Sequence, residues 1–140
     1  AMPRRVGTGV DPKRLAMIIA VLARHGGIAL GQADVFVNVA GGLRIDEPGA
    51  DLGIALAIAS AAKGSAVPAG TAAFGEIGLT GRLRPAAQAD RRLEECAKLG
   101  LTAVIVPAAT KERPGVEATA VETLKQAIGA ALTGKAEPRR

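Results

Sequence analysis

The sequence predicts a single α/β domain in which helices pack on a mixed sheet. Of the 140 residues, 49% are apolar, and a chain of this size and composition can build one compact core. Segments with the apolar spacing of helices also alternate with short β-branched runs bounded by glycine or proline. The interleaving indicates an α/β architecture with helices packed on the sheet.

Four helices are expected, at about residues 12–25, 48–62, 87–99 and 121–132. Asp11 and Pro12 suit the N-cap and first turn of the first helix, which the glycine pair 26–27 ends. The second helix is apolar nearly all round, which predicts a central buried helix that stops at Gly64. Gly100 is expected to cap the third helix.

Strands are expected at residues 34–40, 72–77, 82–86 and 103–106. The second and third form a predicted hairpin around Thr80-Gly81, and the run 103–106 suits an interior strand buried on both faces. Loops are expected at 7–9 and 111–117.

The charge balance favours a phosphate-bearing partner. Lysine and arginine outnumber aspartate and glutamate by 18 to 13, which gives a net charge of +5, and many of the bases occur in close pairs. Solvated basic faces without a ligand are the alternative. Phe36 and Phe74 are the only aromatic residues, so few side chains are available to stack on DNA bases. DNA binding would therefore depend on phosphate contacts, which are sensitive to salt and give little sequence specificity.

Several site classes are not expected. No apolar run approaches the roughly 20 residues that span a bilayer, so the chain is expected to be cytoplasmic. Cys96 is the only cysteine and His25 the only histidine, which argues against a disulfide or a zinc site. We expect Cys96 to be a small core residue and His25 to meet the dipole at the end of the first helix.

Two partial matches to known motifs are not expected to form functional sites. Ser60 and Lys63 have the S-x-x-K spacing of penicillin-binding enzymes, but they lie at the C-terminal end of a helix and the partner motifs are absent. Residues 129–136, GAALTGKA, nearly match a phosphate loop but lack the final hydroxyl residue and a following helix.

Residues 47–61, EPGADLGIALAIASA, and residues 74–85, FGEIGLTGRLRP, together resemble the proteolytic domain of Lon. The resemblance implies the Lon-like (ribosomal protein S5 domain 2-like) fold. In Lon-type peptidases a serine follows the proline of the first segment, and a lysine lies a few residues beyond the second. Here the serine position is Gly49 and the lysine position falls on or near Asp90, so cleavage by the Lon mechanism is not expected.

The chain is also similar, from Pro3 to Leu132, to the C-terminal Lon-like domain of the RadA (Sms) family of bacterial DNA repair proteins. The family pattern DVFVNVAGGLRI.EPAADL stands here as DVFVNVAGGLRIDEPGADL. Small departures are Gly49 and, where an acid is common, Arg82. The resemblance implies a DNA repair and recombination ATPase that forms a hexameric ring, binds duplex DNA, supports branch migration and acts with a recombinase filament.

The family's zinc finger, RecA-like ATPase and KNRFG motif are not found here, so ATP, Mg²⁺ and Zn²⁺ are expected in upstream domains and no cofactor in this chain. The chain is expected to be an excised domain, with Ala1-Met2 as a cloning scar. We expect an N-terminal segment at 1–10, the Lon-like domain at 11–133 and a disordered tail at 134–140.

The first candidate DNA contacts are basic residues expected to flank the cleft that holds the active site in Lon-type peptidases: Arg44, Arg82 and Arg84. A second group lies near the N-terminus: Arg4, Arg5, Lys13 and Arg14. Asp51 is expected to be stabilised by the dipole at the N-terminus of its helix, and Glu76 is expected to lie on an exposed face of the hairpin. A salt bridge to Arg44 or Arg82 is the alternative.

Three rival functions stay open at this point. They are a Lon-type serine peptidase, a pure oligomerisation module without DNA binding, and a domain of another ATPase such as a magnesium-chelatase-like protein.

Overall fold

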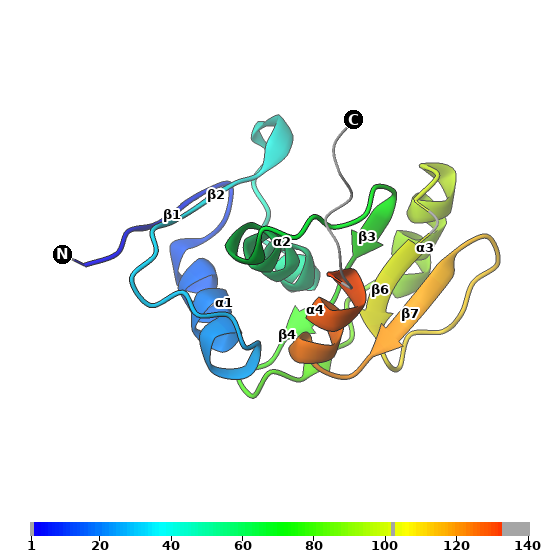
Figure 1. Cartoon of the computed structure of the whole chain (residues 1–140). Coiled ribbons are helices and arrows are strands. Elements are labelled where there is room, and N and C mark those ends of the chain that lie inside the picture. The colour runs from blue at the N-terminus through cyan, green and yellow to red at the C-terminus, as the bar shows by residue number, and fades with distance from the viewer. Residues whose placement is uncertain (1, 102, 133–140) are drawn as a thin grey trace.

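The computed structural model describes residues 2–101 and 103–132. Helices and strands interleave along the chain, so the predicted α/β class is confirmed (Figure 1). The strands form three small sheets: parallel β1-β2, parallel β3-β6-β7 and antiparallel β4-β5. The elements are β1 (Arg5–Thr8), α1 (Pro12–His25), β2 (Val35–Asn38), α2 (Asp51–Lys63), β3 (Thr71–Ala73), β4 (Glu76–Ile77), β5 (Leu83–Arg84), α3 (Ala89–Lys98), β6 (Ala103–Pro107), β7 (Glu117–Val121) and α4 (Leu124–Ala131).

Helix α1 forms as predicted. The Asp11 side chain caps it by accepting a hydrogen bond of 3.0 Å from the Arg14 N–H, and Pro12 opens the first turn. Its buried face includes Leu15, Ile18 and Leu22, which lie at helical spacing. The helix therefore buries one apolar stripe against the core.

Helix α2 is the buried centre of the domain, as its all-round apolar sequence predicts (Figure 1). It contacts α1, α4 and the short strands β2, β3 and β4. A 3-10 turn at Pro48–Ala50 precedes it, and Gly64 in the left-handed conformation ends it. Both predicted boundaries are thus close to the observed ones.

The predicted loop at residues 7–9 was wrong, because β1 (Arg5–Thr8) pairs in parallel with β2. The N–H groups of Val35 and Val39 donate to the carbonyls of Arg4 and Thr8 at 2.8 and 3.0 Å. Two glycines in this stretch weaken its strand signal, but the backbone ladder forms without their side chains.

The run 72–77, predicted to be one strand, divides at Phe74-Gly75. Before the division, β3 pairs in parallel with β6, and after it β4 pairs antiparallel with β5. The hairpin around Thr80-Gly81 is therefore confirmed, but it begins only at Glu76. Gly75, at φ 152°, supplies the change of direction between the two sheets.

Strand β6 is the interior strand of the β3-β6-β7 sheet, as predicted. Strand β7 was missed, and the last helix begins at Leu124 rather than at Val121. The sequence of β7, Glu-Ala-Thr-Ala-Val, contains two alanines, which have low strand propensity. The predicted tail at 134–140 lies outside the described residues.

The core has a large cluster around α1, α2 and α4 and a smaller one where α3 covers the β3-β6-β7 sheet. Phe74, Leu93 and Val106 belong to the smaller cluster. Among the described residues, no helix has the length and apolar character needed to cross a bilayer.

Candidate functional site

The start of α2 is tied to the point where β3 ends. The Gly49 carbonyl accepts a hydrogen bond of 2.8 Å from the Gly75 N–H, and the Gly75 carbonyl accepts one of 3.1 Å from the Leu52 N–H. Gly49, which stands at the predicted serine position, is buried. This position therefore lies inside the packed domain, between α2 and the strand region.

The space above Gly49 is filled by Arg92 from α3. A Cβ atom on Gly49 would lie 2.9 Å from Nη2 and 3.1 Å from Cζ of Arg92, and 3.0 Å from the Cβ of Ala86. These distances are shorter than ordinary van der Waals contacts. The glycine and the arginine are therefore complementary in shape.

Three contacts hold the Arg92 guanidinium in place. Nε donates to the Ala87 carbonyl at 2.8 Å, and Nη2 lies 3.4 Å from Glu47 Oε1. The guanidinium carbon is 5.9 Å from the centre of the Phe74 ring, within cation–π range. A guanidinium stays protonated in proteins, so this group cannot take a proton from a nucleophile.

The structure places Arg92, rather than Asp90, against Gly49. Asp90 is exposed in the first turn of α3. Arg92 was not predicted as part of the site; its side chain is 29% exposed and lies against Gly49. Its sequence signal is a basic residue two positions beyond Asp90.

Asp51 is a buried carboxylate at the centre of a polar cluster. Its side chain is 1% exposed and accepts two hydrogen bonds from Arg14, from Nε at 2.6 Å and Nη2 at 2.5 Å. It also accepts one of 3.1 Å from the Ile77 N–H. Asp51 lies in the first turn of α2, as expected, and the alternative partners Arg44 and Arg82 were wrong, because Arg14 bonds both carboxylate oxygens.

This cluster joins three elements, α1, α2 and β4. Glu76, with a side chain 33% exposed, lies 3.8 Å from Arg14 and adds a second carboxylate. The hydrogen bond with Asp51 raises the pKa of the Arg14 guanidinium above its ordinary value. The Arg14 guanidinium is therefore bound by Asp51 and is not available to bind a ligand.

The first group of predicted DNA contacts does not form one patch. The turn at residues 40–42 that precedes Arg44 and the β4-β5 hairpin that carries Arg84 lie on opposite sides of α2 (Figure 1). Arg44 pairs with its neighbour Asp46 at 3.1 Å. Arg82 lies 3.6 Å from Glu122. Arg84 makes no ion pair with another described residue.

The second group divides into engaged and free side chains. Arg4 pairs with Asp34 and lies over the Phe36 ring at 5.4 Å. Arg5 Nη2 donates to the carbonyls of two residues in the loop before β2, both at 3.3 Å. Lys13 is exposed and makes no ion pair among the described residues.

Three other residues considered from the sequence, Ser60, His25 and Cys96, make contacts within the fold. Ser60 Oγ donates to the Ser65 carbonyl at 2.7 Å, just beyond the end of α2. His25 is the last residue of α1, and a Cβ on Gly81, whose φ is 85°, would lie 2.7 Å from its Cβ. Cys96 is buried, and within the described part of the chain no three metal-binding side chains cluster.

A family model described as subunit ChlI of Mg-chelatase matches residues 12–110. The chain belongs to this family. The match covers α1, α2, the hairpin and α3, and it therefore includes both the Gly49–Arg92 contact and the Arg14–Asp51 cluster.

This ChlI-family chain is also similar to bacterial proteins named "DNA repair protein RadA", which confirms the predicted resemblance. The relative from Haemophilus influenzae is 43% identical over 126 residues, covering 90% of this chain. That from Escherichia coli is 43% identical over 131 residues, or 91% of this chain. That from Brucella abortus is 50% identical over 105 residues, or 75% of this chain. The chain spans 28% of the length of the first two relatives and 22% of the third.

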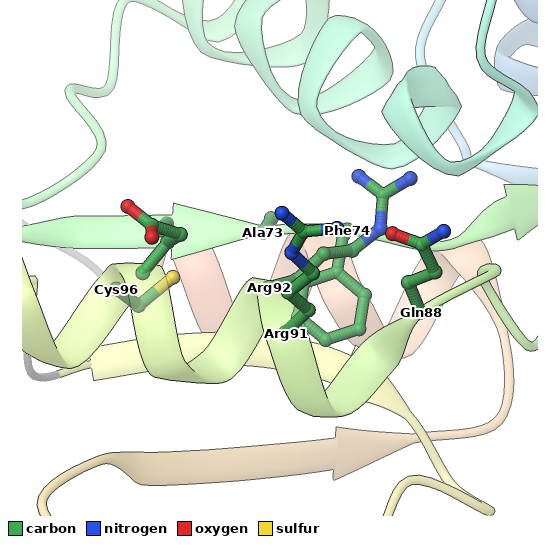
Figure 2. Close-up of a pocket in the computed structure, with 8 residues that line it drawn as sticks. Ala73, Phe74, Gln88, Arg91, Arg92 and Cys96 are labelled. Atoms are coloured by element: carbon green, nitrogen blue, oxygen red, sulfur yellow. The ribbon is translucent and has the colours of Figure 1, made fainter.

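Beside Arg92, this ChlI-family domain has an open groove of about 420 Å³ between β3 and α3. Figure 2 shows Phe74, Gln88, Arg91 and Arg92 at one end of the groove and Cys96 toward the other. Burial, followed by the charge of Glu95, raises the pKa of the Cys96 thiol above its ordinary value. The thiol is thus a poor nucleophile, and the polar side chains that line the groove are Gln88, Arg91, Arg92 and Glu95.

Proposed function

We propose that this chain is a Lon-like domain of a RadA-type DNA repair protein, in which it acts as a DNA-binding platform without peptidase chemistry. The single observation that carries the proposal is the similarity to RadA proteins over about nine-tenths of the chain. The chain covers only part of those relatives, so the activity assigned to the whole protein is also part of this proposal.

The geometry at Gly49 supports a non-catalytic role. A glycine has no hydroxyl to attack a peptide bond, and the guanidinium of Arg92 cannot serve as the base of a Ser-Lys dyad. The contacts of Arg92 with Glu47 and Ala87 keep this cation at the glycine. The residues therefore favour a scaffold over a peptidase.

DNA contact would be made by basic side chains that the fold leaves available. Arg84 and Lys13 carry charges that no described acid neutralises, and Arg82 and Arg44 have only exposed ion pairs, which are weak. Arg14 is withdrawn from this set by Asp51, and Arg5 by its carbonyl contacts. Such scattered charges suit phosphate contact rather than base readout.

In the whole protein, we propose that this domain helps to assemble a hexameric ring and supports branch migration together with a recombinase filament in the cytoplasm. ATP and Mg²⁺ would bind an ATPase domain and Zn²⁺ a zinc finger, both elsewhere in the protein. These roles come from the RadA resemblance.

The test is an electrophoretic shift assay with duplex and single-stranded DNA across a salt series. Reversing two charges in Arg82→Glu/Arg84→Glu should weaken binding and reduce the slope of log K against log salt by roughly 1.8, about 0.9 for each lost phosphate contact on B-DNA. Lys125→Glu/Lys63→Glu is a control of equal charge change on the exposed sides of α4 and α2.

Unchanged binding in the hairpin variant would remove Arg82 and Arg84 from the interface. No DNA shift at any salt, together with a ring by size-exclusion chromatography with light scattering, would favour the pure oligomerisation module. Turnover of casein or a fluorogenic peptide would restore the peptidase alternative.

A further inference from the structure

The β4-β5 hairpin is anchored to the rest of the domain at its turn. The Gly81 carbonyl accepts a hydrogen bond of 2.8 Å from the Leu124 N–H, and the Leu83 N–H donates to the Glu122 carbonyl at 2.9 Å. Gly81 also packs against His25, so the hairpin lies between the ends of α1 and α4 (Figure 1). Side chains on the hairpin therefore start from a fixed backbone.

The outer face of the hairpin carries three charged side chains and one glycine. The pairing register places Glu76 opposite Arg84, and the Gly78 N–H donates to the Arg82 carbonyl at 2.9 Å. Because side chains alternate between the two faces of a strand, Glu76, Arg82 and Arg84 project from the same face. Gly78 leaves a gap on this face, diagonally across from Arg84.

Arg84 is the charged residue of this face that keeps its charge free. Opposite charges that face each other across two strands commonly attract. Here, however, Glu76 lies 3.8 Å from Arg14, and Arg82 lies 3.6 Å from Glu122. Arg84 is exposed and makes no ion pair with another described residue. The acid opposite Arg84 therefore has another partner.

The Arg84 side chain lies over Gly78. A Cβ atom on Gly78 would lie 3.4 Å from Nε and 4.0 Å from Cζ of Arg84, and Gly78 is buried although it belongs to a surface hairpin. Its φ is not positive, so the backbone conformation by itself does not require glycine. A methyl group would just touch the guanidinium, whereas a branched side chain would occupy its space.

We propose that Gly78 positions Arg84 on the outer face of the hairpin to bind a backbone phosphate of duplex DNA. The inference rests on the proposed DNA binding and names the residue that prepares this contact. Because the guanidinium lies against Gly78 on an anchored hairpin, it loses less conformational entropy on binding than a freely moving side chain would. Its planar set of N–H donors can contact two oxygens of one phosphate.

The test is a double-mutant cycle measured by fluorescence anisotropy with a labelled duplex oligonucleotide. Arg84→Ala should weaken binding about fivefold, the size expected for one partly solvated charge-assisted hydrogen bond. Gly78→Val should cause a similar loss, because the branched side chain takes the space of the guanidinium. The double variant should bind no more weakly than either single variant, because both residues act in one contact.

Two further variants separate positioning from hairpin strain and from charge. Gly78→Ala has the same 3.1 Å contact with the Arg82 carbonyl but only touches Arg84, so it should weaken binding less than about twofold. Arg84→Lys keeps the charge but lacks the planar group, so binding should weaken about threefold with an unchanged slope of log K against log salt. Arg84→Lys tests the proposal whether or not Gly78→Val folds, which circular dichroism reports.

The outcomes distinguish this inference from the proposed function. Full DNA affinity in Gly78→Val, equal losses in Gly78→Ala and Gly78→Val, additive losses in the double variant, or parental affinity in Arg84→Lys would each overturn the positioning role while DNA binding itself stands. A parent chain that binds no duplex at any salt would instead refute the proposed function, and this inference with it.

Discussion

The contact between Gly49 and Arg92 predicts that Gly49→Ala destabilises the domain. The new methyl group would lie 2.9 Å from Arg92 Nη2 and 3.0 Å from the Cβ of Ala86. The guanidinium is the far end of a flexible side chain and can yield by giving up part of its contacts with Ala87 and Glu47, so we place the cost in the lower part of the usual overpacking range of about 1–3 kcal/mol. Loss of glycine freedom in the unfolded chain returns about 0.4–1 kcal/mol. We therefore expect the free energy of unfolding to fall by about 1 kcal/mol, the balance of the two effects.

The measurement is urea denaturation followed by far-ultraviolet circular dichroism, because the chain has no tryptophan or tyrosine for fluorescence. In an Arg92→Ala background the methyl group meets only Ala86, so the cost should shrink and leave a coupling energy of about 1 kcal/mol.

Gly53→Ala is the matched control for this prediction. It lies in α2, where a methyl group would meet only the Ala73 carbonyl at an ordinary 3.7 Å. This substitution should stabilise the domain by about 0.5–1 kcal/mol. An equal cost of Gly49→Ala in both backgrounds, or a comparable loss in Gly53→Ala, would refute the interlocked packing of Gly49 and Arg92.

Three further predictions concern the fold. Asp51→Ala should cost about 3 kcal/mol in urea denaturation, because it removes both hydrogen bonds from Arg14 to Asp51 and leaves the buried Ile77 N–H without its acceptor; a loss under about 1 kcal/mol would contradict a stabilising cluster. Asp11→Ala should cost about 1 kcal/mol through the lost N-cap, and no change would show that the cap is dispensable. Burial raises the pKa of Cys96 in the folded state. The stability that the buried neutral thiol contributes is therefore complete below the ordinary pKa of 9.0 and is lost as the pH rises through the folded-state pKa. A maleimide should therefore label the native thiol at pH 8 about tenfold or more slowly than the unfolded chain, and equal rates would sink that reasoning.

The helices were predictable because their signals are local. Asp11, Pro12 and Gly64 mark boundaries through backbone chemistry that needs no tertiary partner. The sequence of α2, apolar at nearly every position, likewise predicts a central helix, although the structure leaves Ala57, Ala61 and Ala62 exposed.

The small strands were less predictable because pairing, rather than side-chain pattern, makes them strands. Strand β7 has alternating alanines, and β1 contains Gly7 and is followed closely by Gly9, so neither sequence has a strong β-strand propensity. The division at Gly75 follows from two different partners, β6 and β5, which lie far along the chain from each other. Local sequence does not contain that information.

Local sequence also does not show which charged side chains of the candidate site are paired. Composition counts every arginine equally, yet Arg14 is bound to Asp51 and Arg92 to Glu47, while Arg84 is unpaired among the described residues. An ion pair holds one positive and one negative charge, so it leaves the net charge of +5 unchanged, but its guanidinium offers little to a phosphate. The fold therefore decides which arginines are available to DNA, and not how large the net charge is. Substituting Arg84 should consequently affect DNA affinity more than stability, whereas substituting Arg14 should do the reverse.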